Sequence, residues 1–87
     1  MANAYPRESV EFQPVEVTRD GLTITTGLEF SIVPDGQRPV TFTPAEMLSG
    51  QTGVIVSGLS QGTYRIFARL TTAQEVPVID CGYFYIT

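Results

Sequence analysis

The chain has 87 residues and a net charge of −4, and all five of its basic residues are arginine. This length accommodates a single domain. The acidic balance argues against nucleic acid as the main partner and against docking on anionic membranes. Val, Ile and Thr make up 26 of the 87 residues, which favours pleated sheet over helix and predicts an all-β protein.

Residues 1–8 are polar and contain Tyr5, Pro6 and Arg7, with no apolar periodicity. We expect a flexible N-terminal arm, with two alternatives for its role. It either frays as many chain termini do, or docks on a neighbouring subunit through Tyr5 and Arg7. Residues 1–12 also lack the apolar core of a signal peptide, so we expect none.

The first predicted strand spans residues 10–18, and its apolar alternation changes phase at Pro14. Such a change predicts an edge strand with a bulge, or a strand that switches between sheets. The next predicted strand runs from Leu22 to Ile32 with an even apolar period. Within it, Gly27 indicates a bulge or the close approach of another backbone.

A short edge strand is predicted around Val40 and Phe42, because prolines flank it and cannot donate to a ladder. Thr43 to Glu46 has the pattern of a helix capping box, which predicts one helical turn that ends at Gly50. Met47 and Leu48 would then close the end of the core.

Three further strands are predicted at residues 53–57, 63–71 and 76–86. Leu59, Gly62 and Tyr64 have the spacing of a tyrosine corner, where an immunoglobulin-like chain turns from one sheet into the next. We therefore expect residues 9–87 to form one immunoglobulin-like antiparallel β-sandwich of six to seven strands, with one short helical turn.

Catalytic and metal-binding chemistry finds little support in the residue types. The usual Ser and Cys nucleophiles need a neighbouring base, and the chain has no His or Lys. Cys81, the single cysteine, excludes an internal disulfide, and we expect it to pack as an apolar residue. Calcium ligands could come from Asp20, Asp35, Glu75 or Asp80, but no EF-hand-like spacing appears. We expect no enzyme activity and no cofactor.

The best candidate contact surface is a row of outward residues on the strand at 63–71. Arg65, Phe67 and Arg69 share one parity there, and they are of types enriched at interface anchors. The arginines could instead pair with acids across the sheet, such as Glu29 or Asp80. Tyr83 and Tyr85 on the last strand either extend this protein-binding surface or fill the core.

From Gly58 onward, the pattern Gly-Leu-x-x-Gly-Thr-Tyr-x-Ile-x-Ala-Arg is followed by Val-Pro-Val-Ile-x-Cys-Gly-x-Phe-x-Ile. This third of the chain resembles small immunoglobulin-like proteins of tailed bacteriophages. The resemblance implies a structural virion role, on the capsid surface or at the head–tail region, after assembly in the host bacterial cytoplasm. Its partners would be capsid, portal or tail subunits, and many copies would bind. The alternative is an immunoglobulin-like module that recognises a cell-surface glycan or protein.

Overall fold

The computed structural model describes residues 3–19, 21–71, 76 and 78–87, and these residues form strands and loops. Among them there is no helix, and hence none that could cross a membrane. The strands are β1 (Asn3–Tyr5), β2 (Glu11–Pro14), β3 (Val17–Arg19), β4 (Leu22–Ile24), β5 (Leu28–Pro34), β6 (Thr43–Pro44), β7 (Glu46–Leu48), β8 (Gln51–Val56), β9 (Gly62–Leu70) and β10 (Val78–Ile86). The expectation of an all-β chain is confirmed.

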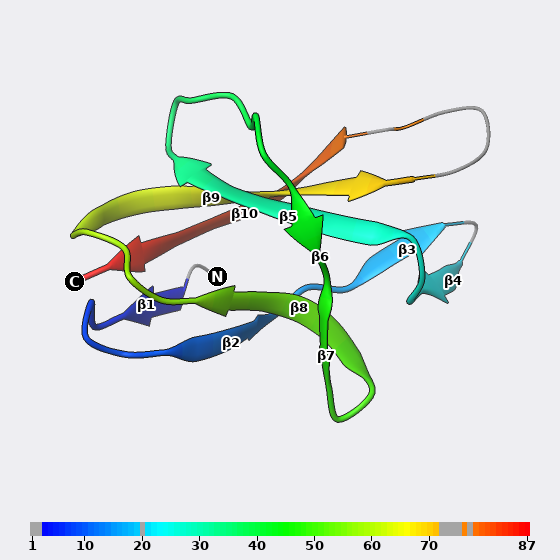
Figure 1. Cartoon of the computed structure of the whole chain (residues 1–87), viewed down its shortest axis with the longest axis horizontal. Helices are drawn as coiled ribbons and strands as arrows, with labels where there is room; N and C mark the ends of the chain where they lie inside the picture. The colour runs from blue at the N-terminus through cyan, green and yellow to red at the C-terminus, as the bar shows by residue number, and fades with distance from the viewer. Residues whose placement is uncertain (1–2, 20, 72–75, 77) are drawn as a thin grey trace.

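The strands form two main sheets and a small ribbon. One sheet has the order β1-β10-β9-β5-β6, the second has the order β2-β8-β7, and β3 and β4 pair with each other. In Figure 1, β5, β9 and β10 run across the upper half of the molecule, and β2 and β8 run across the lower half. This arrangement is compatible with a β-sandwich.

The core lies between these layers, because each main sheet turns one apolar face inward. On β9, Tyr64, Ile66, Ala68 and Leu70 are all buried, as their alternation predicts. Val54 and Val56 of β8 are also buried, whereas Ile55 between them is exposed. The remaining buried apolar side chains are Val15, Val17, Leu28, Phe30, Phe84 and Ile86.

A hydrogen bond holds the turn before β9 in the manner of a tyrosine corner. The hydroxyl of Tyr64 donates to the backbone oxygen of Ser60 at 2.8 Å. The ring of Tyr64 is stacked on that of Phe84, with 5.8 Å between the centroids. One residue thus joins the turn, β9 and β10.

Both long predicted strands in the first half of the chain are interrupted. Pro14 ends β2, and residues 17–19 pair in a different sheet, so of the two expected alternatives the structure has the switch between sheets. Two bonds fix the bend: the amide of Val15 donates to Thr52 O, and the Thr52 hydroxyl donates to Val15 O, both at 2.9 Å. At Gly27, φ is +73° and its carbonyl accepts from the amide of Thr71 at 2.9 Å, the expected close backbone approach.

The predicted helical turn at residues 43–46 is wrong. Thr43 donates its hydroxyl to Phe30 O, and the amide of Ala45 donates to Leu28 O, so β5 holds this segment extended. A single capped turn is marginal by itself, and pairing with β5 and β8 outweighs it.

Strand pairing also replaces the predicted helical turn in the segment after Ala45. β7 pairs with β8, and Ser49 and Gly50, both at positive φ, form the tight turn between them. Met47 and Leu48 are 53% and 54% exposed and do not close the core. The predicted edge strand is present but displaced to Thr43–Pro44, at the end of the five-stranded sheet.

Part of the segment expected as an arm, Asn3–Tyr5, is a strand of the domain itself. β1 pairs in parallel with the end of β10, with Asn3 opposite Phe84 and Tyr5 opposite Ile86. Just beyond it, the amide of Arg7 donates to Thr87 O at 3.2 Å. The N-terminal and C-terminal segments are thus bound to each other.

Candidate protein interaction surface

The outer face of the five-stranded sheet collects most of the residues singled out in the sequence. On β9, Arg65, Phe67 and Arg69 alternate with buried residues, so they point away from the core. Phe67 lies opposite Ser31 of β5 and Asp80 of β10. We call the outward side chains of β5, β9 and β10, together with Phe42, the outer face.

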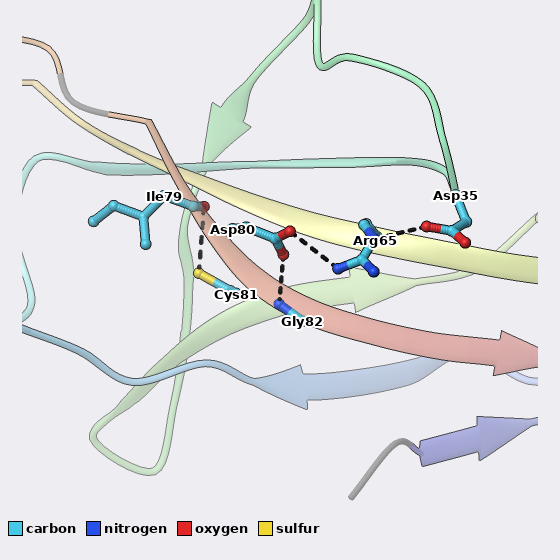
Figure 2. A network of polar contacts seen from close by, with 6 residues as sticks. All are labelled: Asp35, Arg65, Ile79, Asp80, Cys81 and Gly82. Atoms are coloured by element: carbon cyan, nitrogen blue, oxygen red, sulfur yellow. Dashed lines mark hydrogen bonds and ion pairs between the residues drawn. The ribbon is translucent and has the colours of Figure 1, made fainter.

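A bulge in β10 brings two tyrosines to this face. The register with β9 shifts between Asp80 and Tyr83. Gly82 adopts φ +102°, and its amide donates to the Asp80 carboxylate at 2.9 Å (Figure 2). Because the bulge reverses the alternation, Tyr83 and Tyr85 face outward and Phe84 is buried. This explains why the strand is apolar in both phases of its sequence.

Arg65 is held by two carboxylates from different elements. Its Nε lies 2.6 Å from Asp35 Oδ1 and its Nη1 lies 3.0 Å from Asp80 Oδ2 (Figure 2). The hydrogen bond to Asp35, followed by the charge of Asp80, raises the pKa of Arg65 above its ordinary value. The guanidinium also lies 5.5 Å from the ring centre of Tyr83. Asp80 therefore links the bulge to Arg65.

Arg69 forms a second cluster at the other end of β9. Its Nε and Nη2 donate to Glu29 Oε1 at 3.0 and 2.8 Å, and the Thr71 hydroxyl donates to the same oxygen at 3.1 Å. The ring centre of Phe42 lies 4.3 Å from the guanidinium. The alternative of cross-strand ion pairs is thus present: Arg69 pairs with Glu29, and Arg65 pairs with Asp80. These ion pairs hold the two arginine side chains in place on the sheet.

The Glu29 pair makes stability depend on pH in the acid range. The hydrogen bond from Arg69 lowers the pKa of Glu29 below its ordinary value. A depressed carboxyl pKa stabilises the fold above the unfolded-state pKa, about 4.3, and this contribution is lost as pH falls through the folded-state pKa. We predict that Glu29→Gln flattens the fall in melting temperature below about pH 4. The matched control is Glu46→Gln on the other sheet, and an equal flattening in both variants would contradict the prediction.

The two tyrosines are the exposed aromatic residues of the outer face. Tyr83 and Tyr85 are 46% and 41% exposed, and their rings meet edge to face with centroids 5.6 Å apart. A hydrogen bond with Tyr83 is the main cause that raises the pKa of Tyr85. A hollow of about 600 Å³ lies elsewhere on the same face, with Phe42, Phe67 and Val78 in its lining. Aromatic rings and arginine are the groups most often found at the centre of interfaces.

Two predicted residues lie outside this face. Tyr5 is half-buried, packs its ring 6.0 Å from that of Phe84 and donates its hydroxyl to Gln13 Oε1. It therefore supports the core side of the sheet. Arg7 is exposed just after β1, beside Thr87. The structure brings together Arg65, Phe67, Arg69, Tyr83 and Tyr85 only.

Two residues that contact the arginines of the outer face were not assigned to it from the sequence. Asp35 lies in the turn after β5, and Phe42 precedes β6, so neither belongs to the alternating pattern of β9 or β10. The Pro-Asp-Gly turn at residues 34–36 indicated a loop, and its length alone did not show that the carboxylate reaches Arg65.

The acidic residues considered as calcium ligands do not form a site among the described residues. Asp20 and Glu75 lie outside the described residues, and Asp35 and Asp80 both bind Arg65. The described part of the chain contains no cluster of three acidic, His or Cys side chains able to hold a metal. Cys81 lies half-buried at the margin of the core, and burial raises the pKa of its thiol, which keeps it protonated at neutral pH.

Comparison of the chain with known protein families, curated proteins and solved structures finds no match.

Proposed function

We propose that the chain is an immunoglobulin-like domain that acts as a non-enzymatic structural protein of a tailed-phage virion. The strand order supports the fold assignment. The series β10-β9-β5-β6 corresponds to the G-F-C-C′ strands of an immunoglobulin sheet, and β2-β8-β7 corresponds to B-E-D. The bond from Tyr64 to Ser60 O lies at the start of the F-equivalent strand, where tyrosine corners occur.

The observation that carries the functional proposal is the ordered outer face. Arg65 and Arg69 are fixed by carboxylates, and Tyr83 and Tyr85 remain accessible at the Arg65 end of the face. A surface whose side chains are already ordered loses less conformational entropy on binding. This favours recognition of another folded protein.

The resemblance of residues 58–86 to phage proteins supports the virion role, and this role implies which proteins the domain binds. The domain binds capsid, portal or tail subunits, at the capsid surface or the head–tail region. Repeated weak contacts on a symmetric lattice give high occupancy through avidity. The net charge of −4 is consistent with a protein partner in preference to nucleic acid or membrane.

The test replaces the exposed tyrosines and leaves the ion pairs intact. Tyr83→Ser with Tyr85→Ser is compared with Val10→Ser plus Ile55→Ser, which alters residues 72% and 42% exposed outside the outer face. Quantitative mass spectrometry of purified particles measures the copies bound. We expect the tyrosine variant to lose at least about tenfold in occupancy, as two interface anchors would, and the control to load normally. Normal loading of the tyrosine variant, with its melting temperature unchanged, would show that this face is not the contact.

A second candidate function is supported by the same pair of tyrosines. Exposed aromatic rings stack on the apolar faces of sugars, so the domain could recognise a cell-surface glycan. Binding of the isolated domain to a glycan array or to host cells tests this alternative. A purely architectural protein shows no such binding.

A further inference from the structure

The inner side of β10 is incompletely covered near its start. Ile79 lies opposite Ala68, which is fully buried, so both side chains face the core. Nevertheless Ile79 is 40% exposed. An inward-facing isoleucine with this exposure indicates that part of the layer beside it is open.

The opening is a hollow of about 620 Å³ between β10 and the bend that joins β2 to β3. Its lining consists of residues 13–18 on one side and residues 79–84 on the other, together with Ile66 of β9. In the described part of the chain, β1 pairs only with the last residues of β10, from Phe84 to Ile86. In Figure 1, β1 lies beside the end of β10 that precedes the C-terminus. The same edge of β10 from Val78 to Asp80 therefore meets no strand among the described residues.

We propose that this edge and hollow bind an extended segment of another polypeptide, which adds a strand beside β10. Backbone groups of an open edge are a template for such pairing. The segment would continue the row that β1 begins, and one apolar side chain would cover Ile79. The bulge limits the pairing to about three residues of β10, because the Gly82 amide is already bound to Asp80. The proposal does not depend on the virion role.

The charge of the hollow's lining indicates which kind of polypeptide segment would bind there. Glu16 and Asp80 are the charged residues in the lining, and both are acidic. Asp80 is bound by Arg65, whereas Glu16 is exposed. A second copy of the chain carries a net charge of −4, which makes it a poor match. The chemistry fits a segment of a different protein that alternates apolar residues with basic or neutral polar ones.

The test is an NMR titration of the full chain with synthetic peptides of about seven residues, a length within the usual range for strands. One peptide alternates valine with lysine and threonine, a second has the same composition with its valines grouped, and a third carries glutamate in place of lysine. We expect the alternating basic peptide to shift the signals of residues 78–80 and 13–18. The grouped and acidic peptides should bind more weakly.

A matched pair of variants tests whether the side chain of Ile79 contacts the bound peptide. Ile79→Ala should weaken binding about tenfold through lost apolar contact, whereas Val78→Ala, at the outward-facing neighbour, should leave it unchanged. Glu16→Gln should weaken binding at low salt, and Glu8→Gln should not.

Four results would overturn the proposal. The first is that no chemical shifts change up to the solubility limit of the peptide, and the second is that only signals of the outer face change. The third is that the grouped peptide binds as tightly as the alternating one. The fourth is that the signals of residues 78–80 depend on protein concentration when no peptide is present. The last of these would assign the edge to a second copy.

Discussion

Phe84→Ala is expected to destabilise the domain by about 3–5 kcal/mol, which is a large part of its total stability. The side chain is 1% exposed and packs between the rings of Tyr5 and Tyr64. A domain of 87 residues has about 4–13 kcal/mol in all. The melting temperature should therefore fall by about 15–30 °C, as measured by calorimetry or circular dichroism.

The adjacent residue provides the control for Phe84→Ala. Tyr85 is 41% exposed on the opposite face of the same strand, and Tyr85→Ala should cost under about 1 kcal/mol. The contrast depends on the bulge at Asp80–Tyr83, which decides which of the two side chains faces inward. Similar losses in both variants would contradict the described orientation of β10.

Gly53→Ala is the second change expected to have a large effect, because it tests the contact between β2 and β8. A Cβ atom at Gly53 would lie 2.3 Å from the backbone oxygen of Gln13 and 2.6 Å from Cζ of Phe12. The Phe12 ring could rotate away, but the carbonyl belongs to the paired strand. Alanine in a strand is normally favoured over glycine by about 0.5–1 kcal/mol. The clash outweighs this gain, and we expect a net loss of about 1–3 kcal/mol in denaturant unfolding.

A double variant separates the two contacts at Gly53. Phe12→Ala removes the ring but leaves the Gln13 carbonyl, so Gly53→Ala should still be destabilising in the Phe12→Ala background. Faster amide exchange at Val54 and Val56 should accompany the loss. If the double variant is as stable as Phe12→Ala alone, β2 does not lie as close to β8 as described.

Alternation in the sequence was sufficient to predict the strands that have one face on the core. The buried residues of β8 and β9 follow the pattern closely, since each of those faces packs against the opposite layer. The pattern also placed Arg65, Phe67 and Arg69 together on the outward side. Glu29 and Asp80 were foreseen as their partners, because the acids lie on strands that neighbour β9.

Local signals failed where tertiary pairing decided the conformation. Thr43 to Glu46 resembles a helix start, but hydrogen bonds from β5 hold it extended. The orientation of Tyr83 was left open, because a bulge can reverse the parity of a strand and its position is not visible in composition. The hollow beside Ile79 was not predicted, since it lies between β10 and the bend at residues 13–18, which are far apart in the sequence.

The most direct test of the proposed function is electron cryomicroscopy of virions that contain this protein, at a resolution that separates strands. The proposal predicts density for a two-layered domain whose Tyr83 and Tyr85 contact a capsid, portal or tail subunit. A domain attached through the β2-β8-β7 sheet with both tyrosines facing solvent, or particles that carry no copy of the protein, would contradict it.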